Sequence, residues 1–262
     1  MKPLIQRPKR MLVASDLHCG HRIGLTPPQW QGMYTKEEYN HIQSELWALF
    51  AQEINLLKPF DIAVWNGDLV DGKGFRSGGT ELITTDRFEQ SEIAADVIRF
   101  VDAETNVLTF GTPYHAGVNE DWEIVVAELV GAEIRSEQFI EINGTIFDFR
   151  HFLGSSSIPH GKGTPLGKER LWNIIWSYHD GQPDSDVIIR SHVHDFHFDG
   201  DDSYLAMTTP ALQGHGTKYG ARIMSKYVHF GFIHFDIDWN GAFSWKPHIF
   251  KGLSQKREPL SL

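Results

Sequence analysis

Short apolar runs alternate with longer segments of helical spacing through the first half of this chain. Two of these segments, 38–57 and 90–104, carry apolar residues at intervals of three and four, which predicts amphipathic helices, and a shorter helix is predicted at 122–130. Strands are predicted at the apolar runs 11–15, 61–66 and 106–110. This alternation of strand and helix predicts a sheet with parallel strands and helices packed on it.

After residue 138 the pattern becomes typical of antiparallel strands. Segments 139–142 and 145–150 flank Asn143-Gly144, which predicts a hairpin with a type I′ turn because both residues tolerate a positive φ. The remaining predicted elements are a helix at 165–179 and strands at 186–191, 203–209 and 228–239. Together they predict one α/β (α+β) domain over residues 1–262, with two mixed sheets packed face to face, helices outside, and flexible ends at 1–10 and 253–262.

The composition narrows the classes of function. A formal net charge of −10 over 262 residues argues against sequence-independent binding to long nucleic acid, although two bound divalent cations would reverse the sign locally. The single cysteine, Cys19, excludes a disulfide framework within the chain. Segment 1–10 lacks the apolar core of a signal peptide, and no run reaches the roughly 18 apolar residues of a membrane span. We therefore expect a cytoplasmic domain with no membrane partner; its oligomeric state stays open.

Aspartate and histidine residues follow the predicted strands. They are Asp16, His18, Asp68, Asp71, His115, His151, His192 and His194. A strand end is a rigid mount, and side chains on several strand ends can converge on one point. Alternate residues of a strand face alike, so Asp16 and His18 are expected to point the same way, and the same holds for His192 and His194. A single Asp-x-His motif is usually a surface turn. The joint pattern predicts a metal site, and carboxylates with imidazoles suit Mn²⁺, Fe or Zn²⁺ better than Ca²⁺.

The order of these motifs resembles that of the calcineurin-like metallophosphoesterases, over residues 11 to about 195. Two further segments are similar to family members found in phages and prophages, namely Ser15-Asp16-Leu17-His18 with the loop after it, and residues 203–213. The resemblance implies a four-layer sandwich in which helices flank two mixed β-sheets, with a dinuclear metal site on loops at the strand ends.

The resemblance also implies a role for each motif residue. One ion would be held by Asp16, His18, Asp68 and His194, and the other by Asp68, His151 and His192, with Asp68 as the bridge. His115 would stabilise charge and protonate the leaving group, and Asp71 would orient a ligand or a water; both are counted as catalytic. The family has Gly-Asn-His at the third motif, where this chain has Gly111-Thr112-Pro113-Tyr114-His115. Thr112, a water or Asn119 could replace the missing Asn ligand, and the second ion is expected to bind more loosely.

These residues predict a metallophosphoesterase, a phosphatase or phosphodiesterase with a bridging hydroxide as nucleophile. Two divalent ions are expected, with Mn²⁺ preferred and Fe, Zn²⁺ or Ni²⁺ as alternatives. The acidic chain favours a small phosphate ester or nucleotide as substrate. A nuclease acting on DNA or RNA, a single-metal hydrolase or metal-storage site, and a binding protein of the same fold that has lost catalysis remain as alternative readings.

Several residues are weaker candidates. His21, Arg22 and Tyr114 are predicted to contact the substrate, since Arg and His⁺ bind phosphate and an aromatic ring can stack on a base. Cys19 is either a thiolate ligand or a small buried residue beside the site. Trp30 and Tyr34, like Tyr114, could stack on a base or an aromatic leaving group or could cover a core edge, and His197 and His215 could line the mouth of the site.

Overall fold

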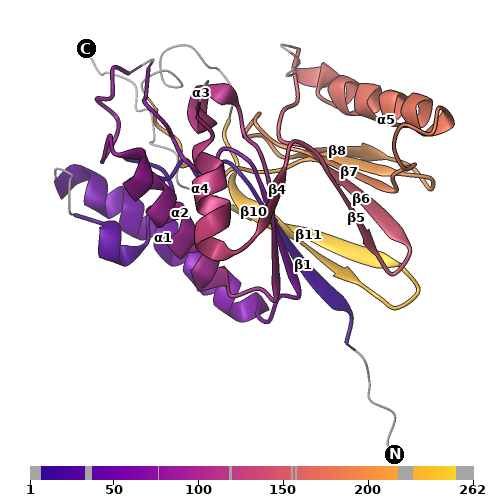
Figure 1. Cartoon of the computed structure of the whole chain (residues 1–262), viewed down its shortest axis with the longest axis horizontal. Helices are drawn as coiled ribbons and strands as arrows, with labels where there is room; N and C mark the ends of the chain where they lie inside the picture. The colour runs from indigo at the N-terminus through magenta and orange to yellow at the C-terminus, as the bar shows by residue number, and fades with distance from the viewer. Residues whose placement is uncertain are drawn as a thin grey trace, which may run out of the picture.

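Two β-sheets pack face to face, with helices on the outer side of each (Figure 1). The computed structural model describes residues 7–32, 37–75, 77–117, 120–154, 156, 158–217 and 227–251. The six-stranded sheet has the order β11-β10-β1-β2-β3-β4, from β1 (Lys9–Ala14), β2 (Ile62–Asn66), β3 (Thr105–Thr109), β4 (Glu133–Arg135), β10 (Phe230–Ile237) and β11 (Phe243–Phe250). The five-stranded sheet has the order β5-β6-β7-β9-β8, from β5 (Gln138–Ile142), β6 (Thr145–Phe149), β7 (Val187–Arg190), β8 (His197–Gly200) and β9 (Leu205–Thr208).

Both sheets are mixed, as the sequence predicts. Strands β1 to β4 pair in parallel and β10 joins β1 antiparallel, while in the other sheet β6, β7 and β9 are parallel. Helices α1 (Glu37–Leu57), α2 (Arg87–Val101) and α4 (Trp122–Val130) cover the larger sheet, and α5 (Gly163–Tyr178) lies on the smaller one (Figure 1). The short elements are α3 (Pro113–Ala116) and the 3-10 turns η1 (Pro28–Trp30) and η2 (Pro159–Gly161). The predicted four-layer arrangement is therefore confirmed.

Strand β1 shows how alternating side chains build two cores. Met11 and Val13 face the smaller sheet and pack with Phe147 of β6, whereas Leu12 and Ala14 face the helices. All five residues are fully buried, as expected for a central strand covered on both faces. This explains why the run reads as continuously apolar instead of alternating.

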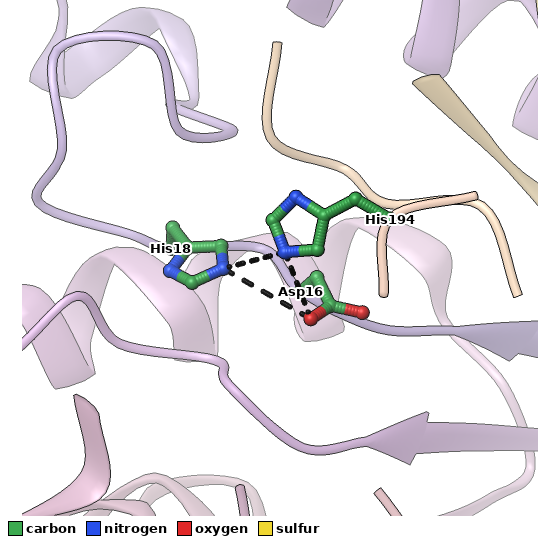
Figure 2. Close-up of side chains that lie close together, drawn as sticks. All are labelled: Asp16, His18 and His194. Carbon is green, nitrogen blue, oxygen red and sulfur yellow. Dashed lines mark hydrogen bonds and ion pairs between the residues drawn. The ribbon is translucent and has the colours of Figure 1, made fainter. Parts of the chain in front are cut away.

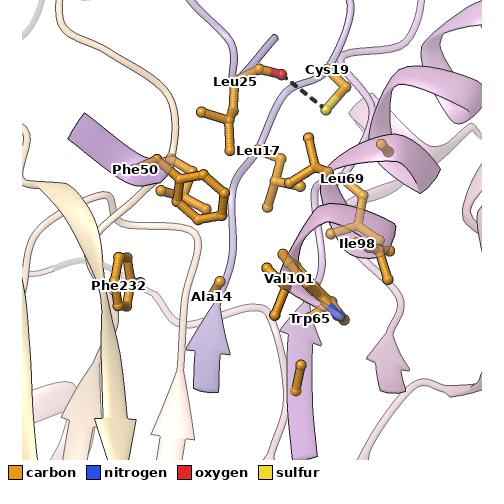
Figure 3. Close-up of a cluster of buried hydrophobic side chains, with 14 of the residues drawn as sticks. Ala14, Leu17, Cys19, Leu25, Phe50, Trp65, Leu69, Ile98, Val101 and Phe232 are labelled. Atoms are coloured by element: carbon orange, nitrogen blue, oxygen red, sulfur yellow. Dashed lines mark hydrogen bonds between the residues drawn. The ribbon is translucent and has the colours of Figure 1, made fainter. Parts of the chain in front are cut away.

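The helix-side core anchors the loops that carry the candidate ligands (Figure 3). Leu17 follows Asp16 and Leu69 follows Asp68, and both leucines are fully buried in this core. Burying one such side chain stabilises a fold by about 1.5–3 kcal/mol. Each leucine therefore holds its loop against the core, next to a carboxylate that belongs to the site.

The structure confirms the predicted strands and helices to within a few residues and adds elements that the pattern missed. Asn143 and Gly144 both have positive φ, as the predicted type I′ turn requires. The missed strands are β4, β8 and β11; β4 has only three residues, and β8 and β11 are edge strands that are largely exposed or half-buried. Residues 1–6 and 252–262 lie outside the described residues, whereas Lys9 and Arg10 belong to β1.

Helix α5 turns most of its apolar side chains outward. The apolar residues that mark the helix in the sequence, Leu171, Ile174, Ile175 and Trp176, are 37% to 55% exposed, and the residues of α5 that are buried are Leu166 and Asn173. Asn173 is buried because its amide bonds to the 183–185 segment. None of the helices within the described residues is both long and apolar enough to cross a lipid bilayer.

Candidate metal centre

The candidate ligands gather where the carboxyl ends of strands from both sheets meet. Strand β1 leads to Asp16 and His18, β2 to Asp68, β6 to His151, and β7 to His192 and His194. Figure 2 shows Asp16, His18 and His194 pointing toward one another, although 176 residues separate His18 from His194. The structure thus brings together side chains that the sequence only places after strands.

The backbone achieves this convergence in a way that the sequence analysis did not predict. Five of the six predicted ligands have left-handed backbone conformations, with φ between 46° and 71°: Asp16, His18, Asp68, His192 and His194. Asp16 and His18 do point into the same site, as expected, but β1 and β7 end before these motifs, so strand alternation is not the cause. A non-glycine residue in this region costs roughly 1–2 kcal/mol, and such strain tends to gather at functional sites.

The first group of ligand atoms consists of Asp16, His18 and His194. Asp16 Oδ1 lies 3.1 Å from Nε2 of His194 and 4.0 Å from Nε2 of His18, and the two imidazole nitrogens are 3.2 Å apart. The other oxygen of Asp16 accepts hydrogen bonds from the Ser15 hydroxyl at 2.6 Å and from the His192 amide at 3.3 Å. Oδ1 is buried and accepts no hydrogen bond from the described residues; its neighbours are the imidazole nitrogens of the site.

The second group consists of Asp68, His151 and His192. Asp68 Oδ2 lies 3.0 Å from Nε2 of His151 and 3.7 Å from Nδ1 of His192. His151 donates from Nδ1 to the carbonyl oxygen of Asn66 at 2.7 Å, which fixes the ring and directs Nε2 inward. That Nε2 atom is buried and, among the described residues, has no hydrogen-bond partner.

The two groups adjoin and share a third. His151 Nε2 is 3.9 Å from Asp16 Oδ1, which links one group to the other. His18, Asp68 and His115 also offer ligand atoms within 4.8 Å of one another. Cations in the two groups would therefore be neighbours. Asp68 belongs to two of the three sets, as a bridging carboxylate would.

Burial and charge make this cluster suited to a cation. Burial opposes ionisation, yet the histidines hold the pKa of Asp16 and Asp68 well below the usual range, with His194 strongest on Asp16 and His151 on Asp68. Burial alone would lower the pKa of His151, but Asp68 and Asp16 raise it to about 10. Burial, with a contribution from His115, lowers the pKa of His18 to about 4, so this imidazole is neutral, as a metal ligand must be. The orphaned oxygen and nitrogen atoms fit divalent cations.

Thr112, one of the replacements considered for the missing asparagine, contacts Asp68. Its amide and hydroxyl lie 2.6 Å and 3.1 Å from Oδ1 of Asp68 and donate to it. Thr112 therefore orients the carboxylate, and within the described residues the second group has three side-chain ligands. The other replacement considered, Asn119, lies outside the described residues.

Asp71 and His115 lie beside the candidate ligands. Asp71 Oδ1 is 3.1 Å from Nδ1 of His18. His115 donates from Nδ1 to the carbonyl oxygen of Asp71 at 2.9 Å, and its side chain is 18% exposed. Burial opposes ionisation, but His21 and His18 lower the pKa of Asp71 to about 2. Asp71 thus supports both imidazoles as an ionised carboxylate.

Glu123 is a supporting residue that the sequence analysis missed. It is fully buried at the start of α4, and its two oxygens accept hydrogen bonds from the amides of Leu69 at 2.8 Å and Gly111 at 2.5 Å. These amides belong to the loops after β2 and β3. Glu123 therefore ties together the loops that present Asp68 and Thr112.

The predicted substrate residues separate into two kinds. His21 is buried and accepts from the Ile23 amide, and Arg22 forms an ion pair with Glu81 at 2.7 Å, so protein groups already hold both. Tyr114 instead lines a cavity next to His115.

The remaining weaker candidates have structural environments. Burial raises the pKa of Cys19, whose thiol lies 3.3 Å from the carbonyl oxygen of Leu25, which fits a small buried residue and not a thiolate ligand. Trp30 donates to Asp96 on α2. His197 begins β8, His215 is partly buried, and Tyr34 lies outside the described residues.

Comparison with known proteins finds solved structures that are weakly similar to this one. No family model and no curated protein matches this chain. A Vps29 variant from Entamoeba histolytica is 15% identical with a TM-score of 0.47, covering 92% of this chain and 99% of that one. An archaeal phosphodiesterase is 12% identical with a TM-score of 0.43 and coverages of 91% and 99%. A predicted phosphoesterase from Streptococcus pneumoniae is 11% identical with a TM-score of 0.43 and coverages of 95% and 97%. Identities and TM-scores at this level carry no argument about function.

Proposed function

We propose that this protein hydrolyses phosphoester bonds with the help of two divalent cations. The observation that carries the proposal is the pair of adjoining ligand groups, in which Asp16 Oδ1 and His151 Nε2 are buried without hydrogen-bond partners in the described part of the chain. Such atoms are costly to bury unless something binds them. Aspartate oxygens and imidazole nitrogens are the donors that Mn²⁺, Fe and Zn²⁺ accept.

The ligand groups support one place for each cation. Asp16, His18 and His194 would hold one ion, His151 and His192 the other, and Asp68 would lie between them. When bound, the ions would supply Lewis acidity toward the phosphoryl group and would acidify water. The protein would contribute pre-oriented ligands, and His151 would give up the proton on Nε2 in order to hold a cation there.

His115 is the proposed acid of the reaction. Its Nδ1 hydrogen is committed to the Asp71 carbonyl, which leaves Nε2 to contact a phosphoryl oxygen or to give a proton to the leaving group. The ring lies at the partly exposed edge of the cluster, 4.4 Å from the ring of His18. A group in this position could contact the substrate while Asp16, Asp68 and His151 stay buried.

A binding protein that has lost catalysis is the second candidate. It is favoured by Thr112, which occupies the place of an asparagine ligand and donates to Asp68 instead of facing a cation. A second ion held by three side chains would be bound more weakly, and a protein with one resident ion could still recognise a phosphate group. Turnover distinguishes the two functions.

The test is a substrate panel. We expect bis-p-nitrophenyl phosphate, p-nitrophenyl phosphate or single-stranded DNA to be hydrolysed with Mn²⁺, Zn²⁺, Ni²⁺ or Mg²⁺, and Asp68→Asn to abolish turnover. His115→Ala should mostly lower kcat, by about 10²–10⁴-fold, because it removes an acid and leaves the ligands in place. Glu128→Gln, at an exposed position of α4, is the matched control. Metal-loaded protein that binds phosphate without hydrolysing any ester would favour the binding protein.

A further inference from the structure

We propose that a cavity beside His115 receives the leaving group of the ester and favours a leaving group with a flat aromatic ring. This inference rests on the proposed function. The cavity has a volume of about 190 Å³, and the residues around it include Gly72, Lys73, Phe75, Tyr114, His115 and Glu120. Pockets for drug-sized ligands hold about 300–1,000 Å³. This one therefore suits a single ring system and not a folded nucleic acid strand.

Aromatic rings lead outward from His115. The ring of Tyr114 is 4.7 Å from that of His115, and the ring of Phe75 is 6.1 Å from that of Tyr114, both in edge-to-face geometry. Phe75 is 60% exposed, although a phenylalanine gains most by burial. A ring bonded through oxygen to the phosphorus would continue this row and cover Phe75. The acid proposed for the leaving group thus adjoins the surface that would hold it.

The charges around the cavity favour a ring over a second phosphate. Arg87 is committed to an ion pair with Glu120 and lies 4.6 Å from the ring centroid of Trp122. Lys73 Nζ is 5.9 Å from the centroid of the Phe75 ring, within the range of a cation–π contact. Since Glu120 offsets Arg87, Lys73 is the remaining basic residue at the rim among the residues that the structure describes, and it can face a ring in the way it faces Phe75.

Matched esters test this subsite. Benzyl and cyclohexylmethyl phosphates, as monoesters and methyl diesters, release alcohols of similar acidity and differ in the flatness of the ring. We expect the wild-type kcat/KM to favour the benzyl ester by about three- to tenfold, the worth of an aromatic pair. Phe75→Leu and Tyr114→Leu should bring the ratio close to one, because leucine keeps apolar surface without a ring. Trp239→Leu, at an exposed site beyond the end of β10, should keep the ratio.

A binding measurement separates this inference from the proposed function. Calorimetry with Zn²⁺-loaded protein would compare benzylphosphonate with cyclohexylmethylphosphonate, which cannot be hydrolysed. Tighter binding of the benzyl compound that Phe75→Leu abolishes, with no turnover of any ester, would reject the hydrolase and keep the subsite. Turnover with equal ratios in all variants would reject the subsite and keep the hydrolase.

A different observation concerns the outer face of helix α5. Six large apolar side chains there are 37% to 83% exposed: Leu171, Trp172, Ile174, Ile175, Trp176 and Tyr178. At about 200 Å² for a large side chain, they expose on the order of 600 Å². The partner of a standard protein interface buries roughly 800 Å². A continuous apolar face of this size is uncommon on a monomer.

We infer that this face pairs with the same face of a second copy of the chain. Residues 171–178 contain no charged side chain, so the face offers nothing to a phosphate backbone. A cavity of about 560 Å³ reaches this face at Trp172 and Trp176, but the arginines that line it, Arg150 and Arg190, are already paired with Glu169. In a twofold pair, two identical apolar helices meet without repulsion between like charges, and each supplies most of the area that a stable interface needs.

Sedimentation velocity over a wide range of protein concentration tests the pairing. We expect a dimer for the wild type and a monomer for the double variant Trp172→Glu with Trp176→Glu, because charges would be buried at the interface. Trp239→Glu places a charge at another exposed tryptophan and should remain dimeric. Circular dichroism and metal content should match in all three proteins. A monomeric wild type, or a dimer that survives the double substitution, would overturn the inference.

Discussion

The Nδ1 atom of His18 lies 3.1 Å from Oδ1 of Asp71, and both side chains are almost fully buried. The contact leaves Nε2 of His18 to face Asp16 and His194. A carboxylate behind a ligand histidine fixes the ring and makes it a better donor. We expect Asp71→Asn to weaken metal affinity by about ten- to a hundredfold, since the amide keeps the shape and loses the charge.

Competition with a chromophoric chelator would measure this affinity. Asp96→Asn is the control, since Asp96 is an acid on the surface of α2 that bonds to Trp30 and lies outside the ligand groups. Equal metal affinity in wild type and Asp71→Asn would show that Asp71 does not support the ligand.

The two ligand groups should differ in affinity. In the first, Asp16 is fully buried and His18 nearly so, whereas in the second the His192 side chain is 35% exposed and lies 3.7 Å from Asp68. We expect calorimetric titration with Zn²⁺ to give two unequal binding steps, and His192→Ala to lose the weaker step while keeping the tighter one. Elemental analysis after dialysis would then find about one ion per chain. Two ions retained by His192→Ala would exclude His192 as a ligand.

Gly67 should be essential to the site because of what surrounds it. It has a φ of +76°, and a Cβ atom there would lie 2.6 Å from Cγ and Nδ1 of His151. Gly131 is a matched control, since its φ is +66° and nothing lies within 4 Å of its Cβ position. Both alanine variants carry a backbone cost of roughly 1–2 kcal/mol. We expect isothermal titration to show a loss of metal binding for Gly67→Ala and none for Gly131→Ala, because only at Gly67 must the ring of His151 move. Equal losses in both variants would mean that only backbone strain matters.

The sequence predicts the place of the ligands better than their geometry. Asp16 and Asp68 are recognisable because each follows a buried apolar run, and a strand end is a position that a pattern can mark. The left-handed conformations that aim these side chains depend on contacts between segments far apart, such as the hydrogen bond from the His18 amide to the carbonyl of Asp68. No local pattern contains that information.

The sequence contains one indication that Glu123 is buried. In the helix 122–130, Glu123 shares one face with Val126, Ala127 and Val130, at spacings of three, four and seven. An acid at a position where an apolar residue is expected indicates a buried partner for it. Its partners, the amides of Leu69 and Gly111, could not be named without the fold.

The hydroxyl groups of Ser15, Thr209 and Ser191 form a buried hydrogen-bonded chain, which should contribute to both stability and metal binding. Thr209 Oγ1 lies 2.7 Å from the hydroxyl oxygens of Ser15 and Ser191, and Ser15 donates to Asp16. Thr209→Val keeps the shape and leaves two buried hydroxyls short of a partner, at a cost of about 1–3 kcal/mol in the free energy of unfolding. Urea unfolding would measure it, with the exposed Thr105→Val as control. We also expect weaker metal binding, because Asp16 would be less firmly held. Unchanged stability would show that this chain of hydroxyl groups is dispensable.

Glu123 should make the stability of the metal-free protein fall as pH rises. Burial, followed by the charge of Asp68, raises the pKa of Glu123 from 4.5 to about 7. Between these values the folded protein keeps a proton that the unfolded chain has lost, so the stabilisation is fully present below about pH 4.5 and is lost as pH passes 7. The free energy of unfolding of the wild type, minus that of Glu123→Gln, should therefore fall by on the order of 3 kcal/mol from pH 4.5 to 7.

Chemical unfolding in the presence of a chelator, at several pH values, measures both free energies. Subtracting one from the other cancels the titration of the histidines, which both proteins share. Glu128→Gln, at an exposed site on the same helix, should show no such trend. A difference that stays flat from pH 4.5 to above 7 would mean that Glu123 is ionised throughout, held as a carboxylate by the two amides that it accepts from.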